Sequence, residues 1–362
     1  MGHTRAIHQI MPAFLYGDAV GNQALRIREL LRRWGYHSQV YAEIRDRRIL
    51  DPGLDYTRYR GHPDDLVIFH YSIGSPVTQF VRSLRSRVVL YYHNVTPPHY
   101  LQPYNAEMAR FLEQGCRELS LFRDVPFAMA ASEYNRQQML AAGFSDVVVL
   151  PYFLYLDELL ASANGPTGRT VAQRFSDGAT NVLFVGRLVP NKRQDDLIRS
   201  FRYYHRLVNP RSRLILVGSD ASAPGYRLEL EVLAETLGIE DRVCLAGAAG
   251  LQEGLGGYYA AATVFVCLSE HEGFCVPLLE AMAFDVPVVA YAAAGVPYAL
   301  GEAGLLVKKK RYDVIAELVD RVVHDEGLRR QVVARQRQRL AELSPAKTAE
   351  QLRRCLEQML SL

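Results

Sequence analysis

The chain lacks the features that mark a secreted, disulfide-stabilised or membrane-spanning protein. Its 362 residues include only five cysteines, and none of them forms a C-x-x-C pair. Scattered cysteines of this kind are typical of reduced thiols and argue against a disulfide framework or a zinc site. No run of about 18 apolar residues is present, so the sequence predicts no membrane-spanning helix.

The N-terminus and the charge balance narrow the class of protein further. Residues 1–11 contain His and Arg but no apolar core, so we expect no signal peptide and a cytoplasmic location. The formal net charge is only +3, which is too small to predict a nucleic-acid partner. A single hydrophobic core rarely extends over a chain of this length, so two domains are expected.

Strand-like apolar runs alternate with helix-like stretches along the chain. Residues 22–34, for example, carry apolar side chains at the i, i+3, i+4, i+7 spacing of a helix. Such alternation predicts an α/β fold with two doubly wound, Rossmann-like units. The expected strands are 6–12, 38–42, 66–70, 88–92, 127–131 and 147–150, then 181–185, 213–217, 243–245, 264–268 and 286–291, with a short edge strand at 304–307.

A polar stretch that contains glycine and proline interrupts this alternation between Ala161 and Thr180. Its composition predicts an interdomain linker. The expected domains are therefore 1–165 and 181–344, joined by a linker at 166–180.

Two cations follow the first strand of the second half. Gly186-Arg187 ends the apolar run, and Lys192 precedes a helix-like stretch. A helix N-terminus attracts anions, and an added Arg and Lys would form a clamp for a diphosphate. The alternative is a pair of solvated surface cations beside a turn.

Two glutamates, Glu272 and Glu280, lie eight residues apart around a predicted helix start. In an open α/β sheet, ligands bind at such a junction, outside the carboxyl end of a strand. Glu280 is suited to accept from a ribose diol and Glu272 from sugar hydroxyls. The alternative is one loop glutamate and one helix-surface glutamate without a ligand.

Several segments together resemble one family, the retaining family-4 glycosyltransferases. Residues 272–283 resemble the E-x7-E motif of that family, and Gly186-Arg187 with Lys192 resembles its second signature. Residues 17–21 resemble its glycine-bearing first loop, and residues 92–94 its strand-end histidine segment. Residues 287–290 and 301–307 match in order and spacing, so the resemblance covers nearly the whole chain.

The resemblance implies a GT-B architecture, in which two Rossmann-like domains face each other across a cleft. The C-terminal domain would hold a sugar nucleotide and the N-terminal domain an acceptor, with a terminal helix at about 345–362 crossing back to the first domain. By position, the implied catalytic residues are His93, Glu272, Arg187 and Lys192. The implied donor-binding residues are Gly17, Gly186, Arg187, Lys192, Glu272, Gly273, Phe274, Cys275, Val276 and Glu280, and Asp18 and Tyr16 are candidates for the acceptor.

Two positions depart from the family pattern. Cys275 and Asp285 stand where many relatives have glycine. We expect the backbone near Cys275 to accommodate a side chain, and the geometry of the turn at Asp285 stays open.

The chain has no Asp-x-Asp triplet of the kind that holds a metal ion on a diphosphate. Arg187, Lys192 and helix N-termini would supply the positive charge instead, so we expect no metal and no cofactor. The resemblance also implies retention of anomeric configuration by front-face attack.

Arginines decorate the predicted first helix and the segment after it. The set comprises Arg26, Arg28, Arg32, Arg33, Arg45, Arg47 and Arg48. They form either a solvated face or a docking surface for anionic lipid at the inner face of a membrane.

Donor and acceptor stay open at this stage. The expected reaction moves a hexose from a nucleoside diphosphate sugar, with GDP-mannose or another GDP-sugar favoured over a UDP-sugar, to a glycan or lipid-linked acceptor in cell-surface polysaccharide synthesis. A sugar-nucleotide epimerase of the same architecture and a non-catalytic nucleotide-sugar binding protein are the alternatives.

Overall fold

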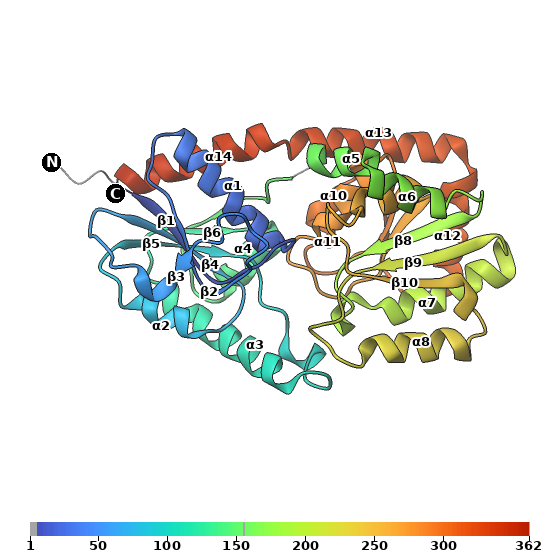
Figure 1. The fold of residues 1–362 in the computed structure, drawn as a ribbon, viewed down its shortest axis with the longest axis horizontal. Helices are drawn as coiled ribbons and strands as arrows, with labels where there is room; N and C mark the ends of the chain where they lie inside the picture. The colour runs from blue at the N-terminus through green and yellow to red at the C-terminus, as the bar shows by residue number, and fades with distance from the viewer. Residues whose placement is uncertain (1–5, 155, 362) are drawn as a thin grey trace. The chain divides into compact units, whose positions relative to one another are not determined.

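A computed structural model describes residues 6–154 and 156–361 of the chain. Residues 1–5 of the N-terminal segment, together with 155 and 362, lie outside the described residues. The chain divides into two units, each with its own core (Figure 1). The first consists of residues 6–98, 109–153 and 344–361, and the second of residues 99–108 and 154–343, apart from 155.

The first unit is built on a seven-stranded parallel sheet in the order β3-β2-β1-β4-β5-β6-β7. Parallel strands are covered by helices on both faces and therefore have long apolar runs, as in β4, which is buried along its whole length. The strands are β1 (Ile7–Phe14), β2 (Val40–Arg45), β3 (Leu54–Asp55), β4 (Leu66–Tyr71), β5 (Arg87–Tyr92), β6 (Ala128–Ala130) and β7 (Val147–Val149). The α-helices that begin in this part of the chain are α1 (Ala19–Arg33), α2 (Pro76–Arg82), α3 (Ala106–Glu118) and α4 (Glu133–Ala141).

The second unit repeats the design with a six-stranded parallel sheet in the order β10-β9-β8-β11-β12-β13. Helices α7 and α8 lie on one face of the sheet, and α5, α6 and α10 lie on the other (Figure 1). The strands are β8 (Thr180–Val185), β9 (Ser212–Val217), β10 (Val243–Gly247), β11 (Val264–Cys267), β12 (Val288–Tyr291) and β13 (Leu305–Val307). The α-helices are α5 (Leu156–Asn164), α6 (Pro166–Arg174), α7 (Gln194–Tyr203), α8 (Tyr226–Thr236), α9 (Leu255–Ala261), α10 (Val276–Ala283), α11 (Val296–Leu300), α12 (Tyr312–His324) and α13 (Glu326–Glu342).

Both sheets have the strand order of a doubly wound Rossmann fold, so the predicted α/β class and its two units are confirmed. In each sheet the order reverses beside the first strand, between β1 and β4 and between β8 and β11. Ligands of such folds bind outside the carboxyl ends of the strands at this switch point. In the second unit, the loops that leave β8 and β11 are therefore the place to look for a site.

The prediction of an interdomain linker at 166–180 is wrong. Residues 166–174 form α6, and with α5 this helix packs on α9 within the second unit. A Cβ on Gly257 would lie 2.2 Å from the carbonyl oxygen of Gly168, so glycine here permits close helix packing. The main segment of the second unit accordingly begins at Leu154, earlier than the expected boundary.

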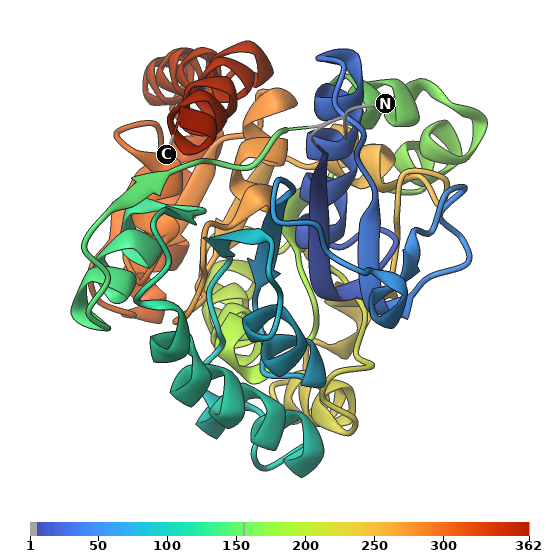
Figure 2. The ribbon, with the colours of Figure 1, turned by 90° about the vertical axis from the view of Figure 1, so that its left-hand side faces the viewer.

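The end of the chain forms helix α14 (Pro345–Ser361), which belongs to the first unit. Arg87 Nη1 donates to the Met359 carbonyl at 3.0 Å, and Gln351 Nε2 donates to the Val149 carbonyl. Figure 2 shows the dark-red helix beside the green segment that contains β7. None of the helices in the described part of the chain is long and apolar enough to cross a membrane.

Candidate donor site at the switch point of the second unit

The carboxyl end of β8 passes very close to the neighbouring strand. Gly186 N donates to the Val217 carbonyl at 2.9 Å, and a Cβ on Gly218 would lie 1.9 Å from the Gly186 oxygen. Only glycine fits at position 218. The chain leaves this narrow point through Arg187, an exposed cation whose Nη1 is 3.5 Å from Ser222 Oγ.

Lys192 and Glu272 come together from the two loops that flank the switch point. Lys192 Nζ donates to Glu272 Oε2, and the two side chains are only 15% and 7% exposed. Asn191 joins the same loops, because its Nδ2 donates to the His271 carbonyl at 3.0 Å and its own carbonyl accepts from Glu270 N at 2.9 Å. The predicted phosphate cation and the predicted sugar ligand thus neutralise each other in this structure.

The loop from Glu272 to Cys275 is supported from behind by Gly295. Gly295 N donates to the Glu272 carbonyl at 2.9 Å, and a Cβ on Gly295 would lie 2.4 Å from the Gly273 oxygen. Phe274 is buried, and Val276 opens helix α10 with a proline in its first turn. The loop therefore presents its backbone at the start of a helix, where N–H groups have no partner within the helix.

The two departures from the family pattern occupy backbone conformations that favour glycine. Cys275 has φ 75° and Asp285 has φ 56°. Asp285 is a tolerated residue in this region, and Arg337 binds its carboxylate at 2.8 and 2.5 Å. Asp285 therefore adopts the left-handed conformation that favours glycine.

Glu280 lies in α10, where it is half-buried and accepts from Tyr259 Oη at 2.6 Å. Burial raises the pKa of this carboxyl, and the tyrosine hydrogen bond opposes that shift. Tyr259 orients one carboxylate oxygen and leaves the other able to accept from a ligand. A hydroxyl pair such as a ribose diol suits such an acceptor.

A buried ionic network supports this site and was not predicted from the sequence. Asp196, only 1% exposed, pairs with Lys310 Nζ at 2.7 Å and Arg193 Nε at 2.9 Å and accepts from Tyr312 Oη at 2.5 Å. Lys310 also binds Glu270 Oε1 at 2.9 Å, in the loop that carries Glu272. Lys310 and Tyr312 lie more than 100 residues from Asp196 in sequence, so no local pattern indicates these two partners.

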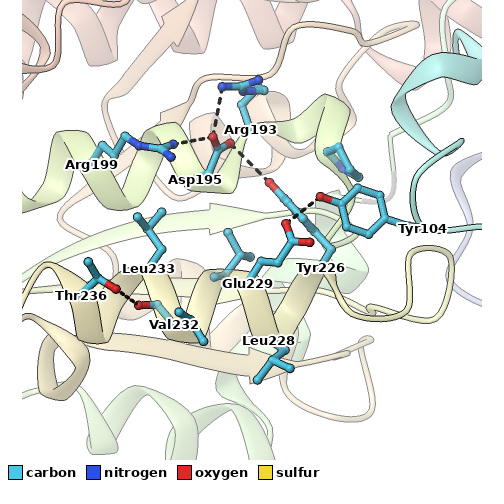
Figure 3. A pocket seen from close by; sticks show the side chains of 12 residues that line it. Tyr104, Arg193, Asp195, Arg199, Tyr226, Leu228, Glu229, Val232, Leu233 and Thr236 are labelled. Atoms are coloured by element: carbon cyan, nitrogen blue, oxygen red, sulfur yellow. Dashed lines mark hydrogen bonds and ion pairs between the residues drawn. The ribbon is translucent and has the colours of Figure 1, made fainter.

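A cavity of about 530 Å³ lies between α7 and α8, and Arg193 of the ionic network lines it (Figure 3). Tyr104 Oη donates to Glu229 Oε2 at 2.7 Å on its wall, and Tyr226 Oη donates to Asp195 at 3.4 Å. Among the described residues that line it, none is a predicted donor-binding residue. We therefore assign the candidate donor site to the loops after β8 and β11.

The predicted loop of the first unit follows β1. Gly17 has φ 74°, and a Cβ built on it would meet nothing within 4 Å, so a ligand has room to approach there. Asp18 caps α1 by accepting from Val20 N at 3.1 Å and Gly21 N at 3.3 Å. Tyr16 lies beneath the guanidinium of Arg48. The cap gives Asp18 a structural role, and binding of an acceptor by Asp18 and Tyr16 stays a prediction.

His93 is buried in a chain of hydrogen bonds within the first unit. Its Nδ1 lies 2.8 Å from Tyr152 Oη and its Nε2 lies 2.9 Å from His70 Nδ1, while His70 Nε2 lies 2.9 Å from Gln9 Oε1. Gln9 Nε2 donates to the Ala24 carbonyl, which fixes Gln9 Oε1 as an acceptor. His70 Nε2–H therefore donates to Gln9 Oε1, His93 Nε2–H donates to His70 Nδ1, and Tyr152 Oη–H donates to His93 Nδ1. Both histidines are thus neutral, with the proton on Nε2. With both ring nitrogens occupied, His93 is held as a positioning group here, and its predicted catalytic role requires rearrangement.

The buried histidine pair leads to a prediction of acid sensitivity. Burial lowers the pKa of His70 to about 3, and burial together with His70 lowers the pKa of His93 well below its ordinary value. As pH falls, the histidines of the unfolded chain are protonated before those of the folded chain. The stabilising contribution of the neutral pair is therefore complete above about pH 6.5, the ordinary histidine pKa. Below that, the free energy of unfolding falls by ~1.4 kcal/mol per pH unit for each histidine.

Denaturant unfolding from about pH 7 to about pH 4.5 measures this slope. The single tryptophan, Trp34, lies in the first unit and reports on it by fluorescence. His324→Ala, which removes an exposed histidine outside the buried pair, serves as the control. A wild-type stability that stays flat down to the acid end contradicts the neutral histidine pair.

Most arginines of the first helix and the following segment have acidic partners. Arg28 is buried and contacts Asp51 at 3.1 Å, and Arg26 contacts Glu29 at 2.8 Å. The remaining pairs are Arg32–Asp51, Arg33–Glu29, Arg45–Asp55 and Arg48–Asp46. This pairing favours the solvated face over the lipid-docking surface.

Comparison with known proteins finds a family to which most of the second unit is similar. Residues 171–339 match the family described as glycosyl transferases group 1. A D-inositol 3-phosphate glycosyltransferase of Actinosynnema mirum is 34% identical over 197 residues, 53% of this chain and 46% of that protein. O-antigen chain mannosyltransferase B of Escherichia coli is 31% identical over 156 residues, 42% of this chain and 39% of that protein. The matched segments span less than half of these curated relatives.

Solved structures extend the likeness to the whole fold. Anabaena HepE in complex with UDP and glucose has a TM-score of 0.76 at 16% identity, over 98% of this chain and 100% of that one. WaaG, a glycosyltransferase involved in lipopolysaccharide biosynthesis, has a TM-score of 0.72 at 16% identity, over 95% and 98% of the chains. Residues 171–339 are therefore similar to the group 1 glycosyl transferases, within a chain whose two units have the Rossmann-like folds of GT-B proteins.

Proposed function

We propose that the chain is a metal-independent, retaining glycosyltransferase that moves a hexose from a nucleoside diphosphate sugar to a glycan or lipid-linked acceptor of a cell-surface polysaccharide. The observation that carries this proposal is the pairing of Lys192 with Glu272 at the switch point of the second sheet. The family match of the second unit and the names of the relatives support the same class of reaction.

In the proposed reaction, the donor exchanges partners with the Lys192–Glu272 pair. The donor diphosphate takes the ammonium of Lys192 and the exposed guanidinium of Arg187, and Glu272 becomes free to accept from the sugar hydroxyls. Negative charge grows on the leaving phosphate as the sugar takes on oxocarbenium character, and both cations stabilise that charge. Asn191 holds the two loops together, so the exchange changes the side-chain partners of Lys192 and Glu272 and leaves the loops in place.

Retention and metal independence are tested with the product and with a chelator. NMR of the product should give the same anomeric configuration as the donor, and an inverted product contradicts the proposed front-face attack. Activity in EDTA should equal or exceed activity without it. Loss of activity in EDTA contradicts the assignment of charge stabilisation to Arg187 and Lys192.

The donor base is decided by a binding screen. The relatives point to different sugars, because the Escherichia coli relative is a mannosyltransferase and the HepE structure is a complex with UDP and glucose. We favour a GDP-sugar, with a UDP-sugar as the second choice. Thermal shifts with GDP, UDP and ADP, followed by their sugars, distinguish these donors.

Glu280→Ala is expected to weaken donor binding without a matching loss of turnover. The carboxylate is assigned to the ribose, far from the bond that breaks, so it contributes to ground and transition states alike. Loss of a hydrogen bond to a charged group of ~1.5–3 kcal/mol raises the donor Kd about tenfold to hundredfold. Calorimetric titration gives Kd, with the exposed Glu317→Ala as the control. An unchanged Kd contradicts the ribose assignment.

A further inference from the structure

Two cysteines that are eight residues apart in sequence meet beside the candidate donor site. Cys267 is the last residue of β11 and Cys275 directly precedes α10. Both are buried, and their sulfur atoms are 4.0 Å apart. The scattered spacing that argued against a metal site conceals this pair, because the intervening loop folds back on itself.

A third ligand group completes a compact cluster. One carboxylate oxygen of Glu272 and the two cysteine sulfur atoms lie within 4.8 Å of one another, and all three residues are buried. Tetrahedral zinc, with Zn–S bonds of about 2.3 Å, places two thiolates about 3.8 Å apart. The observed sulfur separation is close to that value, and it is far longer than the roughly 2.05 Å of a disulfide.

We propose that Cys267, Cys275 and Glu272 bind a thiophilic divalent cation such as Zn²⁺, and that the bound ion blocks the donor site. Two thiolates select thiophilic metals over Mg²⁺ or Ca²⁺. On binding, both thiols release their protons to solvent, and the ion replaces Lys192 as the partner of Glu272. The two thiolates and the carboxylate then carry three negative charges, and the ion carries two positive charges. Lys192 stays nearby and balances the remaining negative charge.

Neighbouring groups are consistent with this coordination. Ser269 is buried and its Oγ lies 3.3 Å from Cys267 Sγ, where a hydroxyl stabilises a thiolate by donating to it. The main-chain carbonyl of Glu272 accepts from Gly295 N, which holds the loop that carries the carboxylate. Three protein ligands leave a fourth position for water, as in open zinc sites.

The blocking effect rests on the proposed function, but the binding of the ion does not. An ion on Glu272 removes the assigned sugar ligand and draws Lys192 toward the negatively charged cluster, away from the diphosphate. We therefore expect added Zn²⁺ to inhibit the transferase, and we expect EDTA not to lower its activity. Metal binding is measured without any substrate, so failure of the transferase assignment leaves this part of the test intact.

The experiment titrates the full reduced chain with Zn²⁺ and follows binding by calorimetry and by metal content after desalting. Wild type should bind one high-affinity ion per chain, and Cys267→Ala and Cys267→Ser should bind it at least about tenfold more weakly. Cys116→Ala removes an exposed thiol outside the cluster and should bind like wild type. Zn²⁺ should also suppress the thermal shift caused by the chosen nucleoside diphosphate in wild type and in Cys116→Ala, but not in Cys267→Ser.

Equal zinc affinity in wild type and the folded Cys267 variants overturns the proposed site. Loss of the high-affinity ion in Cys116→Ala also overturns the proposed site. Tight zinc binding with an undiminished nucleotide shift overturns the blocking role. Thermal melting of each metal-free variant establishes that it is folded, and the serine variant preserves the volume of the buried side chain if alanine does not fold.

Discussion

Lys192→Ala is expected to lower turnover by about 10²–10³, the loss that follows removal of one preorganised donor from a site of developing negative charge. Lys192 reaches the switch point with its ammonium largely buried and directed at Glu272, so it acts where water does not screen it well. The loss should appear mainly in kcat, because the leaving phosphate gains charge only as the bond breaks.

Two controls separate chemistry from folding. Lys308→Ala removes an exposed lysine of the same unit and should leave kcat unchanged. Lys192→Arg keeps the charge and should recover part of the lost turnover. Since the alanine variant leaves Glu272 buried without its cation, thermal melting must accompany the kinetics. Near-normal kcat in a folded Lys192→Ala variant contradicts the clamp.

Asp196→Ala is expected to cost about 3–5 kcal/mol of unfolding free energy, the usual effect of removing one member of a buried ion pair. Asp196 is 1% exposed and joins Lys310, Arg193 and Tyr312. In the variant, Lys310 still has Glu270 as a partner at 2.9 Å, and Arg193 still has Asp195 at 3.1 Å. Because neither cation loses all of its acidic partners, we expect a cost in the lower part of that range.

The same carboxylate gives the network a dependence on acid. Burial acts to raise the pKa of Asp196, but hydrogen bonds from Arg193, Lys310 and Tyr312 outweigh burial and lower it. Its stabilising contribution is therefore complete above the ordinary aspartate value of about 4 and is lost as pH falls through the lowered pKa. Chemical denaturation of Asp196→Ala and of the exposed Asp313→Ala measures the cost. A loss below about 1 kcal/mol, the value of a surface pair, contradicts the role of this network.

The strands were largely predictable from the sequence because a parallel sheet buries both of its faces. Apolar runs such as 66–70 and 213–217 coincide with β4 and β9 to within a residue or so. Strand β3, only two residues long, has no such run. Helix α6 was mistaken for a linker because its proline stands at the start of a helix and its glycine at a helix contact, and both residues also mark loops.

The contacts of the candidate site were less predictable than its residues. Motif positions indicated Lys192 and Glu272, but their mutual pairing depends on how two loops 80 residues apart meet. His70 had no signal of its own, yet it occupies one nitrogen of His93. The cysteine cluster and the Asp196 network likewise arise from tertiary packing, which periodicity and spacing do not encode.

The most direct test of the account is a calorimetric titration of the chain with GDP, UDP and ADP in the presence of EDTA. We predict that one of these nucleotides binds without metal, and that Arg187→Ala and Lys192→Ala each weaken its binding about tenfold or more, as expected for loss of a charged hydrogen bond to a phosphate. If none of the three binds, or if both variants bind as wild type does, the diphosphate site is not at the loops after β8 and β11 and the proposed function falls with it.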